Sequence, residues 1–119
     1  MIPNDVRIFV CVDPVDMRFG FDRLAQIART RVGIDPGAGG ALFVFPNAGA
    51  RRLKVLWFER HGMCMLYKRL HRARFELPTP DGLRVISIDS NALGRLLAGH
   101  STVRRTITEE NKESSAMRA

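Results

Sequence analysis

Residues 41–70 read ALFVFPNAGARRLKVLWFERHGMCMLYKRL, and this stretch decides the fold. It holds three runs rich in β-branched and aromatic residues, a composition typical of β-strands, at residues 41–45, 53–59 and 63–70. Only Arg60-His61-Gly62 separates the last two runs, which predicts a β-hairpin. Short turns join antiparallel strands, because a parallel return needs a crossover of about a dozen residues or more. The stretch therefore predicts an antiparallel meander.

The sequence on either side extends the predicted sheet. Residues 7–12 (RIFVCV) and 84–88 (RVISI) have the same strand-like composition. Residues 74–77 are a shorter candidate, which Pro78 ends. The sheet is thus expected to contain about five to six strands.

Two helices are predicted outside these strands. Apolar residues recur at helical spacing after the first strand, at Met17, Phe21, Leu24 and Ala28. Asp16 is the predicted N-cap of that helix, which is expected to stop before Gly33. A second, short helix is expected to begin at Asp89 or Ser90 and to end near Gly99.

The predicted class is α+β: an antiparallel meander sheet with one helix in the N-terminal half and one short C-terminal helix, the helices covering one face. The 119 residues fit a single domain, assigned to residues 1–100, followed by a polar, flexible tail at 101–119.

No apolar run approaches the roughly 18 residues of a membrane span, and no secretory leader is visible. These features favour a cytoplasmic protein without membrane contact. Cys11 and Cys64 lie in strand-like runs and are expected to be reduced, packed thiols.

The formal net charge of +7 lies in one segment, residues 51–74. This segment has eight basic residues and one acid, Glu59, whereas the rest of the chain is balanced. Basic side chains neutralise phosphates, and arginine can bind one in a bidentate manner, so the segment favours a polyanionic partner. The candidate nucleic-acid-binding residues are Arg51, Arg52, Lys54, Arg60, Lys68, Arg69, Arg72 and Arg74. A solvated rim of arginines is the alternative interpretation of the same charges.

Two aromatic residues lie within the predicted hairpin. Trp57 or Tyr67 could stack on unpaired bases, as aromatic side chains do in proteins that bind single strands. The alternative for both is core or cross-strand packing, which is the expected state of Trp57.

No constellation of residues indicates an enzyme. The three histidines are scattered, without an acid or thiol at a metal-ligand spacing. The glycine-rich turn at residues 35–40 precedes a strand and has no following Lys-Ser/Thr, unlike a nucleotide-binding loop. A metal site for phosphoryl transfer would need three acids that lie close in sequence, Asp13, Asp16 and Asp22. Since Asp16 is explained as a helix cap, a metal-dependent nuclease built on these three acids is the least favoured alternative, and no catalytic residue, metal or cofactor is expected.

A series of short motifs follows in order along the chain: Asp16-Met17-Arg18 with Gly20, Asp35-Pro36, residues 40–45 (GALFVF), residues 54–57 (KVLW), Gly62, residues 67–70 (YKRL), Arg74-Phe75 and Pro78. In this order and spacing they resemble the accessory protein, often called TnpB, from the second reading frame of insertion sequence 66 (IS66) elements. The resemblance covers about residues 6–99. It implies a non-catalytic helper of bacterial DNA transposition, with DNA, a separate DDE transposase and other element-encoded proteins as partners.

The chain departs from the family pattern in several places. Phe19 and Arg23 stand where the helix commonly has Lys and Gly, and Phe58 replaces a second Trp. Residues 59–61 (ERH) replace an Asp-Gly-Thr-like turn, which alters the tip of the hairpin. Two functions stay open: contact with element DNA through the basic hairpin, or docking on the transposase without direct DNA contact.

Overall fold

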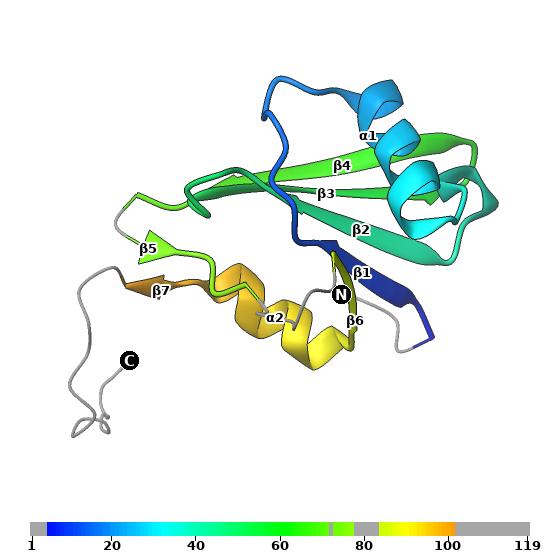
Figure 1. The fold of residues 1–119 in the computed structure, drawn as a ribbon. Coiled ribbons are helices and arrows are strands. Elements are labelled where there is room, and N and C mark those ends of the chain that lie inside the picture. The colour runs from blue at the N-terminus through cyan, green and yellow to red at the C-terminus, as the bar shows by residue number, and fades with distance from the viewer. Residues whose placement is uncertain (1–4, 72, 78–83, 102–119) are drawn as a thin grey trace.

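The computed structural model describes residues 5–71, 73–77 and 84–101 (Figure 1). Its helices and strands, in chain order, are β1 (Arg7–Cys11), α1 (Phe21–Ile27), a π-helical turn (Ala28–Val32), a 3-10 turn (Pro36–Ala38), β2 (Ala41–Pro46), β3 (Arg52–Glu59), β4 (Gly62–Arg69), β5 (Ala73–Arg74), β6 (Val85–Ile88), α2 (Ser90–Ala98) and β7 (His100–Ser101). The α+β class is confirmed. The proposed domain limit at residue 100 stays a prediction, and all of the expected tail except Ser101 lies outside the described residues.

The main sheet is mixed, with the strand order β4-β3-β2-β1-β6. Neighbouring strands are antiparallel except β1 and β2, which run parallel with Arg7 opposite Ala41 and Val10 opposite Val44. The expectation of a purely antiparallel meander is therefore wrong for this pair. Its premise was a short turn between consecutive strands, whereas α1 and the turns after it give β1 and β2 a long crossover.

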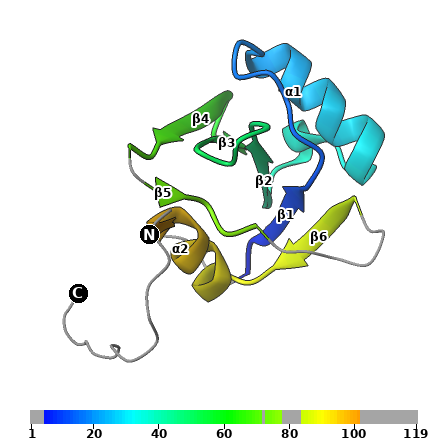
Figure 2. The same cartoon turned by 60° about the vertical axis from the view of Figure 1, so that its left-hand side comes forward.

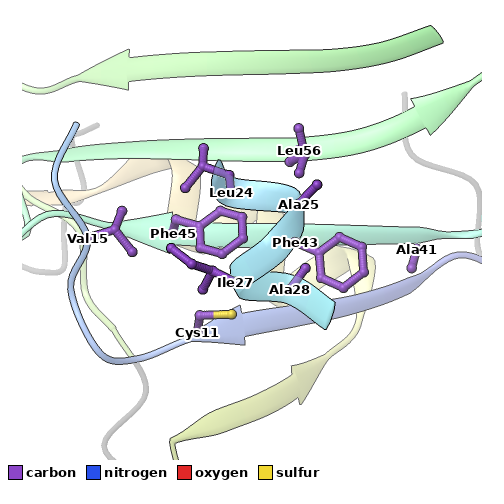
Figure 3. Close-up of a cluster of buried hydrophobic side chains, with 10 residues drawn as sticks. All are labelled: Cys11, Val15, Leu24, Ala25, Ile27, Ala28, Ala41, Phe43, Phe45 and Leu56. Atoms are coloured by element: carbon purple, nitrogen blue, oxygen red, sulfur yellow. The ribbon is translucent and has the colours of Figure 1, made fainter. Parts of the chain in front are cut away.

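The two helices lie on opposite faces of the sheet, so the expectation that both cover one face is wrong (Figures 1 and 2). Leu24 and Ile27 of α1 pack on Phe43 and Phe45, as Figure 3 shows. On the other face, Leu93 and Leu96 of α2 pack in a cluster that includes Val44, Leu53 and Val55. Successive residues of β2 point to opposite faces, and both faces are buried, which explains the unbroken apolar run of this strand.

The first helix begins later than predicted. Its N-cap is Gly20, and Asp16 does not cap it, because the Asp16 carboxylate accepts hydrogen bonds from the backbone N–H and the guanidinium of Arg18. The helical path ends before Gly33, as expected, where φ is 83°. In α2, the prediction of an Asp89 cap is confirmed, since its Oδ1 accepts a 2.7 Å hydrogen bond from the N–H of Ala92.

The predicted hairpin is confirmed as β3 and β4. The register runs from Arg52 opposite Arg69 to Glu59 opposite Gly62, with Arg60 and His61 forming the turn. The strand β5 follows the end of β4 and pairs with β7 in a separate two-stranded sheet (Figure 1). Neither described helix is long and apolar enough to cross a membrane.

Candidate nucleic-acid interface

The hairpin distributes its basic side chains over both faces of the sheet. Side chains of directly opposed strand residues share a face, so Arg52 and Arg69 lie on the same face as the pair Lys54 and Tyr67. This is the face that α1 covers in part, and it is called the α1 face below. Lys68 points to the opposite face, where α2 lies. The basic segment of the sequence is therefore not one surface patch.

Lys54 is engaged inside the protein. Its side chain is only 8% exposed, and its Nζ donates a 2.8 Å hydrogen bond to the carbonyl oxygen of Phe19. The same ammonium lies 5.4 Å from the centroid of the Tyr67 ring. These contacts join β3 to the segment that precedes α1, and they leave Lys54 poorly placed to reach a phosphate.

Lys68 also has a protein partner, although it is exposed. Its Nζ donates a 2.9 Å hydrogen bond to the carbonyl oxygen of Leu97 in the last turn of α2. A cation at the C-terminal end of a helix is favourable, because the free carbonyl groups there carry partial negative charge. Lys68 therefore links the hairpin to α2.

Four arginines gather where the hairpin meets β5: Arg51, Arg52, Arg69 and Arg74, called the arginine end. Arg52 opposes Arg69, and the N–H of Leu70 donates to the carbonyl oxygen of Arg51 over 2.8 Å. A 2.6 Å hydrogen bond from the N–H of Phe75 to the carbonyl oxygen of Ala50 brings β5 to the same turn. Arg51, Arg69 and Arg74 are exposed, and Arg52 is half-buried. No ion pair joins any of the four to another described residue.

Two candidate residues do not belong to this group. Arg60 is exposed in the turn at the other end of the hairpin, where its φ is 55°. Eight-residue strands separate it from the arginine end by roughly 25 Å. Arg72 lies outside the described residues, between Arg69 and Arg74 in the sequence.

The three acids considered as metal ligands, Asp13, Asp16 and Asp22, have different local environments. Asp13 forms an ion pair with Arg84, with 2.6 Å between Oδ2 and Nε. Asp16 forms one with Arg18, and the side-chain and backbone hydrogen bonds from Arg18 lower the pKa of Asp16 from 3.8 to about 2. Asp22 lies in the first turn of α1. No three His, Cys, Asp or Glu side chains gather as metal ligands within the described ranges.

The two aromatic candidates have different environments. Trp57 is half-buried on the α2 side, where its Nε1–H donates to Glu59 over 3.2 Å. With Leu66 and Leu97 it lines an apolar groove of about 610 Å³. Tyr67 is 52% exposed on the α1 face. Trp57 packs against the buried cluster on the α2 side, which confirms its expected packing, whereas Tyr67 is exposed to solvent.

Sequence reasoning missed the structural role of the segment before α1. Phe19 supplies the acceptor for Lys54, and its ring lies 4.7 Å from the guanidinium carbon of Arg23. The motif Asp16-Met17-Arg18 forms a local ion pair beside this contact. An aspartate two residues before an arginine was the available signal for that pair. No local signal indicates that a backbone carbonyl would receive a lysine from β3.

The geometry defines a small α+β protein with an arginine-rich hairpin end and, in its described part, no cluster of metal-ligating side chains. The chain matches the family model described as IS66 Orf2 like protein over residues 6–106, and it belongs to this family, also called TnpB of IS66 elements. The family is one of transposition accessory proteins and is not known to be catalytic.

Two relatives come from Sinorhizobium fredii (strain NBRC 101917 / NGR234). The uncharacterized protein y4hO is 37% identical over 101 residues, covering 83% of this chain and 86% of that protein. The uncharacterized protein y4jC is 32% identical over 95 residues and covers 79% of each. No solved structure matches the chain.

Proposed function

We propose that this accessory protein contacts element DNA during transposition through the arginine end of its hairpin, without itself catalysing strand chemistry. The supporting observation is that backbone hydrogen bonds bring three chain segments, which carry Arg51, Arg52, Arg69 and Arg74, to one end of the hairpin. None of these four arginines forms an ion pair with another described residue. Arg72 belongs to the proposed set by its sequence position, and Arg60 and Lys68 would make secondary contacts. Lys54 stays outside it because it is buried as well as hydrogen-bonded, whereas Lys68 is exposed.

The chemistry suits phosphate better than a single carboxylate. A guanidinium donates two parallel hydrogen bonds to one phosphate, and several on one surface can follow successive phosphates of a strand. Each neutralised phosphate releases condensed counterions, so affinity should fall steeply with salt.

The test is the salt dependence of binding to a duplex that contains an end of the element. Replacing Arg69 and Arg74 together by Gln should lower affinity and reduce the slope of log K against log salt by about 2. The matched control is R29Q. Arg29 lies in the π-helical turn that follows α1, where it is exposed and forms an ion pair with Asp35. This variant therefore loses charge away from the arginine end. No binding at low salt, or an equal effect of R29Q on the slope, would refute the proposal.

The second candidate is docking on the transposase, which the apolar groove on the α2 side favours. Leu66, which lines this groove with Trp57 and Leu97, is 41% exposed. A partner that filled this groove would bury apolar surface already open to solvent. Capture of the purified transposase after nuclease treatment tests it. Loss of capture in L66D, with the duplex salt slope retained, would assign docking to this groove and DNA to the arginine end.

A further inference from the structure

Tyr67 is an exposed aromatic residue among cations. It is the only tyrosine of the chain and is 52% exposed in β4. On the same face, Arg69 lies two residues further along the strand, about 7 Å away. Arg52 is directly opposite Arg69, so two arginines follow Tyr67 on the same face of the hairpin.

The ring has a fixed support. Lys54 lies opposite Tyr67 in the register, with its Nζ 5.4 Å from the ring centroid. The Phe19 carbonyl holds this ammonium in a buried position. A cation near an aromatic ring attracts its π-electrons and favours one orientation of the ring. A supported ring loses little side-chain freedom when a ligand stacks on its open surface.

The form of DNA that could use such a ring is single-stranded. In a duplex the base faces are covered by neighbouring bases, and a protein reaches only phosphates and base edges. In a single strand the base faces are free, and aromatic side chains stack on them with little sequence preference. The ring of Tyr67 provides the stacking surface, while Arg52 and Arg69 can hold the adjacent phosphates.

We propose that Tyr67 stacks on an unpaired base, and that the α1 face of the hairpin binds single-stranded DNA in preference to duplex. This rests on the proposed function, since the same arginine end supplies the phosphate contacts. It adds the substrate class, which is an unpaired segment of element DNA of any sequence. This segment would lie on the α1 face and contact Tyr67 through a base and Arg52 and Arg69 through its phosphates.

The experiment compares a labelled single strand of about 15 nucleotides with its duplex by fluorescence anisotropy at one salt concentration. Y67F keeps the ring and should keep the preference for the single strand. Y67S should lose about ten-fold in affinity for the single strand, with little change for the duplex. H61S is the control, because His61 is an exposed aromatic ring in the turn of the same hairpin, at the end opposite Arg52 and Arg69. It should change neither affinity.

A second measurement locates the contact. A single strand with bromodeoxyuridine at successive positions should photocrosslink to the peptide that contains Tyr67, and the crosslink should fall in Y67S. Crosslinks confined to other peptides would overturn the proposal.

The failures are distinguishable. If Y67S leaves the single-strand preference intact, or reduces both affinities equally, stacking by Tyr67 is refuted. The arginine end survives that result provided that R69Q still weakens binding to both DNA forms. If R69Q changes neither affinity, the proposed function is refuted as well. Thermal unfolding of each variant shows whether the fold is retained.

Discussion

The ammonium of Lys54 donates a 2.8 Å hydrogen bond to the carbonyl oxygen of Phe19, and this contact fixes the segment before α1 against β3. Lys54 is buried in a strand whose neighbouring positions, Leu53 and Val55, are apolar. A buried charge is costly unless it has hydrogen-bonding partners. The Phe19 carbonyl and the Tyr67 ring therefore explain why a lysine is tolerated at this position.

Replacing Lys54 by Met should destabilise the protein by about 1–2 kcal/mol, because it keeps the aliphatic stem but removes a charge-assisted hydrogen bond. The free energy of unfolding in urea measures the effect. K68M is the control, since Lys68 makes a similar hydrogen bond to Leu97 from an exposed position. Its cost should stay below about 1 kcal/mol. A K54M protein as stable as the wild type would contradict a structural role for the buried ammonium.

Gly99 occupies a backbone conformation that other residues rarely adopt, with φ of 78°. A Cβ at this position would also lie 2.5 Å from Cδ1 of Leu70. Leu70 can change rotamer, so the backbone conformation is the larger cost. G99A should lower the free energy of unfolding by about 1–3 kcal/mol, measured by urea denaturation.

Gly94 provides the matched control for Gly99, in the middle of α2. A Cβ there would meet nothing within 4 Å, and the residue is exposed. G94A should therefore stabilise the protein by about 0.5–1 kcal/mol through better helix propensity. Opposite signs for the two substitutions are expected; equal effects would show that Gly99 is not constrained by its backbone.

The features that sequence predicted correctly depend on local signals. The hairpin follows from strand-like runs separated by Arg60-His61-Gly62, and the α2 cap follows from an Asp89 side chain that reaches Ala92. The arrangement of the layers is non-local and was predicted incorrectly. A signal for it was present, because Phe43, Val44 and Phe45 form an unbroken apolar run, as in strands buried on both faces.

From the sequence, the candidate site was predictable only as a segment rich in basic residues, without the spatial arrangement of their side chains. Strand alternation could separate Lys68 from Arg69, and this was visible in the sequence. The burial of Lys54 was not visible, because its acceptor is the Phe19 backbone of another segment. The approach of Arg74 to Arg51 was equally hidden, since it depends on the backbone hydrogen bond between Phe75 and Ala50.

The two cysteines should differ in reactivity. Both are free thiols, and Cys11 is fully buried, which raises its pKa from 9.0 to about 11, whereas Cys64 is half-buried on β4. At pH 8 only about a thousandth of Cys11 would be thiolate even without its steric protection. A disulfide-exchange reagent should therefore titrate one thiol in the native protein and two after denaturation. In C64S the native titration should give none; a rapid reaction of that variant would contradict the burial of Cys11.

The ion pair between Asp16 and Arg18 should persist in acid. Hydrogen bonds from Arg18 lower the pKa of Asp16 from 3.8 to about 2 in the folded protein. Because the folded pKa is the lower one, the stabilising contribution of this group is present above about pH 3.8 and is lost as the pH falls through about 2. The carboxyl chemical shift of Asp16, followed by NMR, should titrate near pH 2. In R18Q the midpoint should return toward 3.8, since the side-chain donor is removed. A wild-type midpoint near 3.8 would show that the pair does not persist in solution.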